Sequence, residues 1–317
     1  MLTTFTAPAF AGTWYIEDGD ITISAGESGN NVTQNENTTE NDPDTIITNR
    51  EEGASSHTVT IDAKDKDDKV EVTLKDVNID ASRGSEAAVS VTGKGDTNIE
   101  LDGDNELKSG AGHAGLEHNK TDTSGELTIQ DKDNNGSLEA AGGFKGAGIG
   151  SAGSNDAQVK ITGGNITATS DDWGAGIGSG SYGTGTVEIT GGEINATGGY
   201  LGAGIGAGCE SDADADITLE GKVTITATAG KDNVAIGANG IEQEFSGLAE
   251  GSSITRYDSE GNDITLPTDP VPAVPSSSGG SSADASVQES VFPGLIVTDK
   301  DGQRISYTSI RDNNVLS

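Results

Sequence analysis

The sequence predicts an all-β protein that winds as a right-handed, single-stranded parallel β-helix with three sheets and about seven coils. The first observation is a pentapeptide, Gly-Ala-Gly-Ile-Gly, at residues 146–150, 174–178 and 202–206, with a degenerate copy at 234–237. The three intact copies are 28 residues apart. A fixed period of this length is typical of one supersecondary unit that stacks on copies of itself.

Alignment on this pentapeptide gives the second observation, three columns of apolar residues with one member per repeat. The first column is Leu74, Leu101, Ile129, Ile161, Ile189 and Leu219. The second is Ile79, Leu107, Leu138, Ile166, Ile194 and Ile225, and the third is Val89, Leu116, Ile149, Ile177, Ile205 and Ile236. We therefore expect three short strands per coil, stacked about 4.8 Å apart with these side chains inside. The usual crossover hand of parallel strands favours right-handed coils.

Local patterns are the third observation. Residues 159–162 and 187–190 alternate apolar and polar side chains, which indicates strands with one buried face. The pairs Gly163-Gly164 and Gly191-Gly192 follow them, where a tight corner between two strands is expected.

The β-helix is expected over residues 12–250. Residues 14–23 resemble a further coil in which Ile16 and Ile21 repeat the spacing of Leu74 and Ile79, and Ile46 or Ile47 closes it after a polar insertion at 26–44. Residues 57–62 form another strand, in a hairpin or an irregular coil. Residues 1–11 end in Ala9-Phe10-Ala11 and are interpreted as a signal-peptide remnant or an artificial end.

The repeat stops after residue 240, and the C-terminal part has a different composition. Residues 251–266 are expected to form a hairpin around 258–262. Residues 267–288 are rich in Pro, Ser and Gly, which is typical of an extended linker. Residues 289–317 are interpreted as a second hairpin or the start of a further domain.

Charge limits the classes of partner. The chain has 52 Asp and Glu against 18 Lys and Arg, a formal net charge of −34. Such a surface repels nucleic acid and anionic lipid, and suits cations or neutral polymers. No stretch is apolar enough to insert into a membrane. Cys209 is the only cysteine and is expected to be a small packed residue, and the sequence does not indicate the oligomeric state.

Aromatic residues precede the pentapeptides and give the candidate ligand-binding site. Phe144, Trp173 and Tyr200 lie one or two residues before the three intact copies, and Tyr182 follows the second copy. We expect the first three to form a row beside the glycines. The C–H faces of a sugar chain can pack on such a row, and aromatic rings contribute strongly to the binding energy where they contact a ligand. The alternative is that the three rings form a hydrophobic patch that seals a corner of the coil.

The pentapeptide glycines allow two interpretations. With Ala and Ile inward, the glycines point outward and form a strip without side chains, on which a flat ligand could lie. Alternatively, glycine permits the close approach of a neighbouring backbone. A nucleotide-binding loop is not indicated, because no helix follows.

Residues 131–136 read Asp-Lys-Asp-Asn-Asn-Gly, the first half of a calcium-binding loop. The candidate ligands of a Ca²⁺ cofactor are Asp131, Asp133, Asn135 and Glu139, although Gly142 stands where a bidentate acid is expected. The alternative is a solvated acidic turn. His113, Glu117 and His118 do not have a known zinc spacing and are expected to be surface residues. No catalytic residue is proposed.

The unit Val-x-Ile-Thr-Gly-Gly-x-Ile-x-Ala followed by Gly-Ala-Gly-Ile-Gly, at 159–178 and 187–206, resembles repeat β-helix surface proteins of Gram-positive and gut anaerobic bacteria. These are similar to the pectate-lyase-like superfamily, and some are classed as carbohydrate-binding domains. The resemblance implies a secreted or cell-surface module without catalysis, whose partner is a polysaccharide or a host or cell-wall glycan.

The sequence therefore predicts an extracellular carbohydrate-binding or adhesive module. Three alternatives remain open. They are a polysaccharide lyase or hydrolase, which needs convergent acids and a base in a cleft, a structural stalk, and an adhesin that binds protein.

Overall fold

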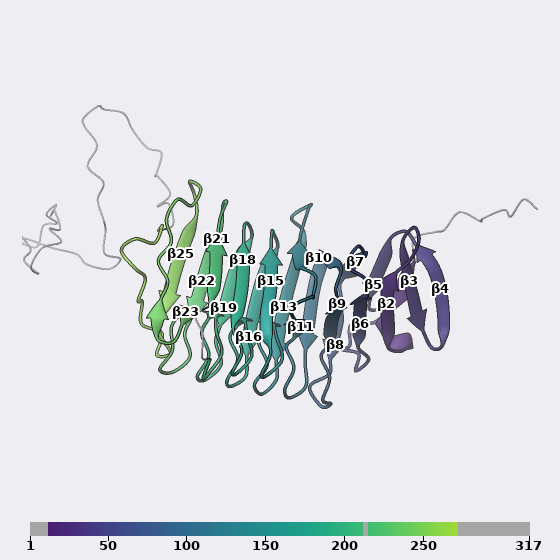
Figure 1. Cartoon of the computed structure of the whole chain (residues 1–317), viewed down its shortest axis with the longest axis horizontal. Helices are drawn as coiled ribbons and strands as arrows, with labels where there is room; N and C mark the ends of the chain where they lie inside the picture. The colour runs from purple at the N-terminus through teal and green to yellow at the C-terminus, as the bar shows by residue number, and fades with distance from the viewer. Residues whose placement is uncertain (1–11, 212–214, 272–317) are drawn as a thin grey trace, which may run out of the picture. The chain divides into compact units, whose positions relative to one another are not determined.

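The computed structural model describes residues 12–211 and 215–271. Within these residues the only helix is a 3₁₀ turn, η1 (Ile16–Asp18), and the ordered elements are otherwise strands. Strands of successive coils pair in parallel in three sheets, and the chain passes through the first, second and third sheet in turn (Figure 1). The predicted parallel β-helix is confirmed.

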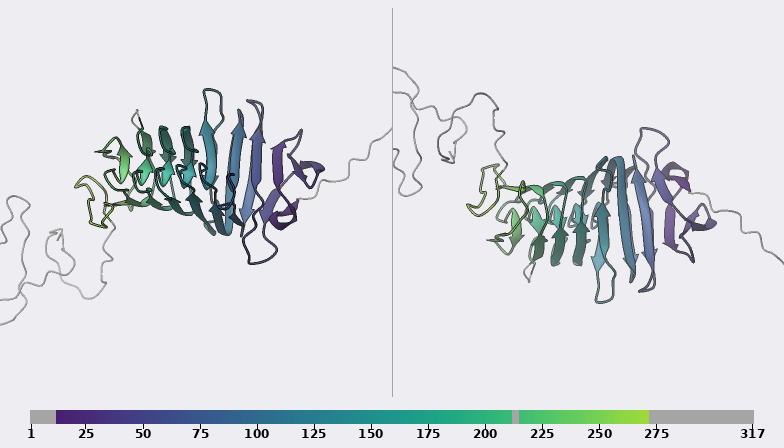
Figure 2. Two further views of the ribbon diagram at one scale, coloured as in Figure 1. Left: turned by 90° about the horizontal axis from the view of Figure 1, so that it is seen from below. Right: turned by 90° about the horizontal axis from the view of Figure 1, so that it is seen from above.

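The strands of each sheet follow one another along the stack, as the views from below and from above also show (Figure 2). The first sheet contains β1 (Thr13–Tyr15), β5 (Thr45–Thr48), β7 (Lys69–Lys75), the first half of β10 (Asp96–Lys108), β12 (Leu127–Gln130), β15 (Asp156–Ile161), β18 (Gly185–Ile189) and β21 (Asp216–Leu219). The second contains β8 (Asn78–Asp80), the second half of β10, β13 (Gly136–Gly142), β16 (Asn165–Ser170), β19 (Glu193–Thr197), β22 (Thr224–Thr228) and β25 (Ser253–Tyr257).

The third sheet contains β2 (Ile21–Ala25), β6 (Val59–Ala63), β9 (Val89–Gly93), β11 (Leu116–Lys120), β14 (Ile149–Gly150), β17 (Ile177–Gly178), β20 (Ile205–Gly206) and β23 (Ile236–Ala238). The first and third sheets thus each have eight strands in the described residues, one per coil. The sequence predicted about seven coils.

The third apolar column is confirmed in the six coils for which it was predicted. Val89, Leu116, Ile149, Ile177, Ile205 and Ile236 are successive register partners, and all are fully buried. Their stacking gives the solenoid a continuous apolar core, because each coil buries its inner face against the next one.

The predicted alignment of the first two columns is wrong at one step, between β10 and the strands β12 and β13 of the next coil. Ile129 pairs with Ile99 rather than Leu101, and Ala140 rather than Leu138 pairs with Leu107. Strand β10 runs without a break from the first sheet into the second, whereas a turn separates β12 from β13 in the next coil. Because side chains alternate with period two, a slip of two residues keeps apolar residues inside.

The N-terminal coils also differ from the prediction. Ile21 pairs with Val59 in the third sheet, so Ile16 and Ile21 do not occupy the first two columns. The strand predicted at 57–62 is β6, a regular strand of the third sheet rather than half of a hairpin. The polar insertion folds into β3 (Asn30–Gln34) and β4 (Asn37–Asp42), which pair antiparallel beside β2 at the N-terminal end of the stack (Figure 1).

The solenoid extends beyond residue 250. Strand β25 pairs in parallel with β22, and Ile254 continues the second apolar column. Of the hairpin expected at 251–266, the structure contains the turn at 258–262 and an isolated antiparallel bridge between Tyr257 and Asp263. A short strand, β24 (Ile241–Glu242), pairs antiparallel with β23. The linker was predicted to begin at residue 267, but residues 267–271 belong to the end of the solenoid, since the amide of Ile254 donates to the carbonyl oxygen of Pro270 at 2.8 Å and Asp269 is buried. The predictions for residues 1–11, for the rest of the linker and for the second hairpin lie outside the described residues.

No helix among the described residues has the length and apolar character needed to cross a bilayer. Cys209 is buried, as expected for a small packed residue. Burial raises the pKa of its thiol, so the side chain is uncharged at neutral pH.

Candidate functional site

Each Gly-Ala-Gly-Ile-Gly segment forms the first half of a tight backbone turn at the third sheet, which we call the arch. The amide of Ala147 donates to the carbonyl oxygen of Ser151, at 3.1 Å. The amides of Ala175 and Ala203 repeat this bond with Ser179 and Ala207. The two arms of the arch therefore lie against each other.

The expected strip of exposed glycines does not exist, because residues 146–150, 174–178 and 202–206 are all buried. A Cβ atom on Gly146, Gly174 or Gly202 would overlap the backbone carbonyl group of the preceding coil. The pentapeptide glycines thus permit close backbone approach, which is the alternative interpretation of the sequence. A flat ligand has no side-chain-free surface to lie on here.

Three of the four predicted aromatic residues meet at the edge of this arch. The ring centroids of Phe144 and Trp173 are 5.4 Å apart, and those of Trp173 and Tyr182 are 6.3 Å apart in an edge-to-face arrangement. We refer to Phe144, Trp173 and Tyr182 as the ring cluster. Phe144 is 40% exposed and Tyr182 is 45% exposed, while Trp173 is half-buried between them. The cluster therefore presents aromatic surface to solvent.

Tyr200 makes no ring contact with the cluster in the part of the chain that the structure describes. The amide of Leu201 donates to the carbonyl oxygen of Asp172, so Tyr200 and Trp173 lie in different columns. This offset follows from the sequence, since Trp173 lies one residue before its glycine and Tyr200 lies two before. The ring of Tyr200 faces Lys231 instead, with Nζ 5.5 Å from the ring centroid. A row of three stacked rings is therefore wrong.

The sequence did not single out Lys145, which lies among the rings. Its Nζ is 5.0 Å from the ring centroid of Trp173, 5.5 Å from that of Phe144 and 5.6 Å from that of Tyr182. Each distance is within the range of a cation–π interaction. Lys145 directly precedes Gly146, as Trp173 precedes Gly174, and this alignment could have identified the pair.

A groove of about 450 Å³ borders the ring cluster at Phe144. Lys108, Ala141 and Thr169 line it and are register partners on β10, β13 and β16, so the groove crosses three coils. Phe144 and Asp171 also line it. The groove thus combines one exposed ring with hydroxyl, amine and carboxylate groups, a composition that suits a hydroxyl-rich ligand.

The pKa values of two groups are raised, one in the ring cluster and one beside Tyr200. Burial and the nearby Glu210 carboxylate raise the pKa of the Tyr182 phenol, which keeps its hydroxyl protonated at neutral pH. Beside Tyr200, a hydrogen bond to that residue raises the pKa of the Lys231 ammonium. Both groups therefore remain hydrogen-bond donors.

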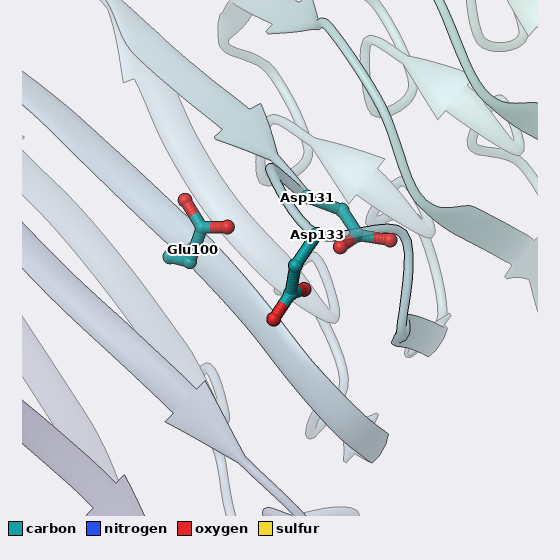
Figure 3. Close-up of side chains that lie close together, drawn as sticks. All are labelled: Glu100, Asp131 and Asp133. Carbon is teal, nitrogen blue, oxygen red and sulfur yellow. The ribbon is translucent and has the colours of Figure 1, made fainter.

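Two of the four predicted metal ligands, Asp131 and Asp133, lie close together. Ligand oxygens of Asp131, Asp133 and Glu100 lie within 4.8 Å of one another (Figure 3). Asp131 and Asp133 come from the turn after β12, and Glu100 comes from β10 in the preceding coil. Glu100 was not predicted, because only the coil register places it beside this turn.

The other two predicted ligands, Glu139 and Asn135, are not part of this group of carboxylates. Glu139 lies on β13 between its register partners Glu106 and Thr167, and is not part of the carboxylate group. Asn135 stays in the turn, where its Nδ2 donates to Asp133 Oδ2 at 3.0 Å.

Hydrogen bonds and an ion pair within the protein also hold the turn after β12. Asp131 accepts hydrogen bonds from the amides of Asn135 and Gly136, at 3.2 and 3.1 Å. The Nζ of Lys132 lies 3.2 Å from Glu100 Oε2. Three convergent carboxylates fit a hard cation, but a bound Ca²⁺ would have to displace or outcompete this lysine.

Glu117 and His118 are not at the surface, contrary to expectation, whereas His113 is partly exposed. Glu117 and His118 are 4% and 2% exposed. Glu117 Oε2 lies 2.8 Å from His113 Nδ1, and Glu117 Oε1 accepts a bond from Asn119 Nδ2 at 3.0 Å. These contacts fix the loop around β11 and make Glu117 a structural residue.

Comparison with known proteins gives one match. A family model described as "Beta helix repeat" matches residues 159–181 and 187–209, which are two consecutive coils of the solenoid. No curated protein and no solved structure matches the chain. The eight stacked coils and this repeat match agree, and together they support a parallel β-helix fold for the chain.

Proposed function

We propose that the protein is a non-catalytic carbohydrate-binding or adhesive module of a secreted or cell-surface bacterial protein. The observation that carries the proposal is the ring cluster, with Phe144 and Tyr182 exposed on either side of Trp173. A chain with 4% aromatic residues has few rings to place, and three of them lie together at one solvent-facing edge. Aromatic residues at such positions contribute a large share of binding energy.

The groove beside Phe144 supports a sugar ligand over a purely apolar one. Its floor crosses three coils and carries Lys108 and Thr169, and Asp171 lies at its side. A polysaccharide presents C–H faces to rings and hydroxyl groups to polar side chains. The groove and the ring cluster together offer both kinds of contact.

The β-helix repeat is compatible with a carbohydrate-related surface protein. The net charge of −34 favours a neutral or cationic partner over nucleic acid. A Ca²⁺ ion held by Glu100, Asp131 and Asp133 is a separate part of the proposal, supported by the proximity of their oxygens.

The test is retention of the purified protein on a panel of insoluble plant, cell-wall and host glycans. The parent should be retained by at least one glycan. Trp173→Ala and Phe144→Ala should each reduce retention, whereas Tyr200→Ala, outside the ring cluster, should reduce it less. Circular dichroism confirms that each variant is folded. Unchanged retention of Trp173→Ala would refute the ring cluster as the site, and no retention of the parent would favour a structural stalk.

A further inference from the structure

Lys145 is held against three aromatic rings and has no carboxylate partner in the part of the chain that the structure describes. Its Nζ lies 5.0–5.6 Å from the ring centroids of Trp173, Phe144 and Tyr182. Among the described residues, no Asp or Glu forms an ion pair with it. The chain has 52 acidic side chains, so the absence of a partner is not due to scarcity.

Four lysines of the solenoid are paired with acids, whereas Lys145, like Lys64, Lys94 and Lys231, forms no ion pair among the described residues. Lys75, Lys132 and Lys160 each lie within 3.2 Å of an Asp or Glu carboxylate oxygen. Lys108, at the groove floor, is paired with Glu106. Lys145 is therefore the ammonium group at the ring cluster that remains available for a negative group on a ligand.

The backbone at Lys145 and at Tyr182 has a conformation that other non-glycine turn residues of the chain also adopt. Lys145 has φ of 74° and Tyr182 has φ of 66°, both in the left-handed region that favours glycine or asparagine. A residue other than glycine costs about 1 kcal/mol there. The rings restrict the rotamers of Lys145, so less conformational entropy is lost when a ligand binds.

The charge of the molecule limits how many negative groups the ligand can carry. A net charge of −34 opposes the approach of a polyanion. One unpaired ammonium group can neutralise one carboxylate, and the rings can pack on the C–H face of the same sugar.

We propose that the ring cluster selects an isolated acidic sugar, a single carboxylate-bearing unit on an otherwise neutral glycan, and that the Lys145 ammonium binds that carboxylate. This inference rests on the proposed function, since it specifies the ligand class of the same site. The acidic unit can be a uronic acid on a plant glycan or a sialic acid on a host glycan, because both present one carboxylate beside a sugar ring.

The experiment is isothermal titration with two matched pairs of oligosaccharides. One pair is a xylo-oligosaccharide with and without a single glucuronic acid, and the other is sialyllactose and lactose. In at least one pair, the parent should bind the acidic member about tenfold more tightly than the neutral one. The pair that shows the preference identifies the source of the acidic unit. A polyuronate should bind more weakly than the acidic member of that pair.

Three variants assign the preference to Lys145. Lys145→Met should abolish the preference, so that the acidic and the neutral member of the pair bind with affinities within about twofold of each other. Lys145→Arg should keep the preference, because a guanidinium also binds a carboxylate. Lys231→Met is the matched control, since it removes a lysine that faces a single ring, and it should behave like the parent.

Failure of this inference can be distinguished from failure of the proposed function. Equal affinity for both members of both pairs, an unchanged preference in Lys145→Met, or tightest binding of the polyuronate would overturn the inference alone, provided that Trp173→Ala still weakens binding. If the parent binds no glycan, or if Trp173→Ala binds as the parent does, both proposals fail.

Discussion

The carboxylate of Glu117 replaces a backbone carbonyl group in the arch of its coil. Its Oε2 accepts a hydrogen bond from the amide of Ala114, at 3.1 Å. In three later coils, the corresponding amides of Ala147, Ala175 and Ala203 donate to carbonyl oxygens. At the C-terminal end the corresponding amide is that of Val234, which donates to Asn233 Oδ1 at 2.9 Å, and Glu242 accepts instead from the amides of Ala235 and Ile236. A glutamate therefore completes the arch in the coil that precedes the Gly-Ala-Gly-Ile-Gly repeats, whereas Glu242 binds amides whose counterparts, Gly204 and Ile205, donate to carbonyl groups of the next coil.

We expect Glu117→Ala to destabilise the solenoid. The substitution removes the acceptor of a buried amide and of two side chains, which costs about 1–3 kcal/mol. The check is the free energy of unfolding in urea. Glu106→Ala is the control, because Glu106 is partly exposed and its pair with Lys108 is worth less than about 1 kcal/mol. Equal effects of the two substitutions would contradict the structural role of Glu117.

The C-terminal end is closed by a fully buried arginine. Arg256 donates to both oxygens of Asp269, at 2.7 and 2.9 Å, and to Glu242 Oε2 and the carbonyl oxygen of Gln243. We expect Arg256→Met to cost about 3–5 kcal/mol, because it leaves the carboxylates of Asp269 and Glu242 without their positive counter-charge. Thermal unfolding followed by circular dichroism measures the effect. Arg50→Met, which breaks an exposed pair with Asp18, should have little effect, and an unchanged melting temperature for Arg256→Met would refute the cap.

Acidification should destabilise the region around His118. Burial lowers the pKa of this imidazole from 6.5, so the folded state favours the neutral form. The unfolded chain binds the proton more readily, and the stability contributed by His118 is therefore present above about pH 6.5 and is lost as the pH falls. The melting temperature between about pH 8 and pH 5 should fall more steeply for the parent than for His118→Gln. Parallel curves would show that His118 does not titrate in this range.

Calcium should stabilise the turn after β12. If Glu100, Asp131 and Asp133 hold the ion, about 1 mM Ca²⁺ should raise the melting temperature of the parent but not that of Asp133→Asn. Asp258→Asn is the control, since Asp258 belongs to another acidic turn, at 258–262, and its variant should still respond. If Ca²⁺ raised the melting temperature of Asp133→Asn as much as that of the parent, this site would be excluded. If Ca²⁺ did not change the melting temperature of the parent, Lys132 would be the counter-charge of Glu100 in place of a metal ion.

The repeat period was sufficient to predict the architecture, because inward residues such as Ile149, Ile177 and Ile205 recur at a constant spacing and stack directly. The register beside β10 could not be predicted. A slip of two residues places equally apolar side chains inside, so the pattern alone does not distinguish Ile99 from Leu101 as the partner of Ile129.

The site was predicted only where it depends on local sequence. Phe144, Trp173 and Tyr182 were identified as aromatic residues beside the pentapeptide, and the structure brings them together. Glu100 belongs to a different coil from Asp131, and only the three-dimensional register relates the two. Lys145 was overlooked because its partners are rings rather than charged residues.

The most direct test of the glycan site uses the fluorescence of Trp173. The chain has two tryptophans, and Trp14 lies at the N-terminal end, where its Nε1 donates to Asp42 at 2.9 Å. Trp14→Phe therefore leaves Trp173 as the only tryptophan reporter. Titration of this variant with a glycan that retains the parent should give a saturable change in Trp173 emission, with the dissociation constant found by calorimetry. Saturable binding in the calorimeter with no change in Trp173 emission would contradict binding at the ring cluster.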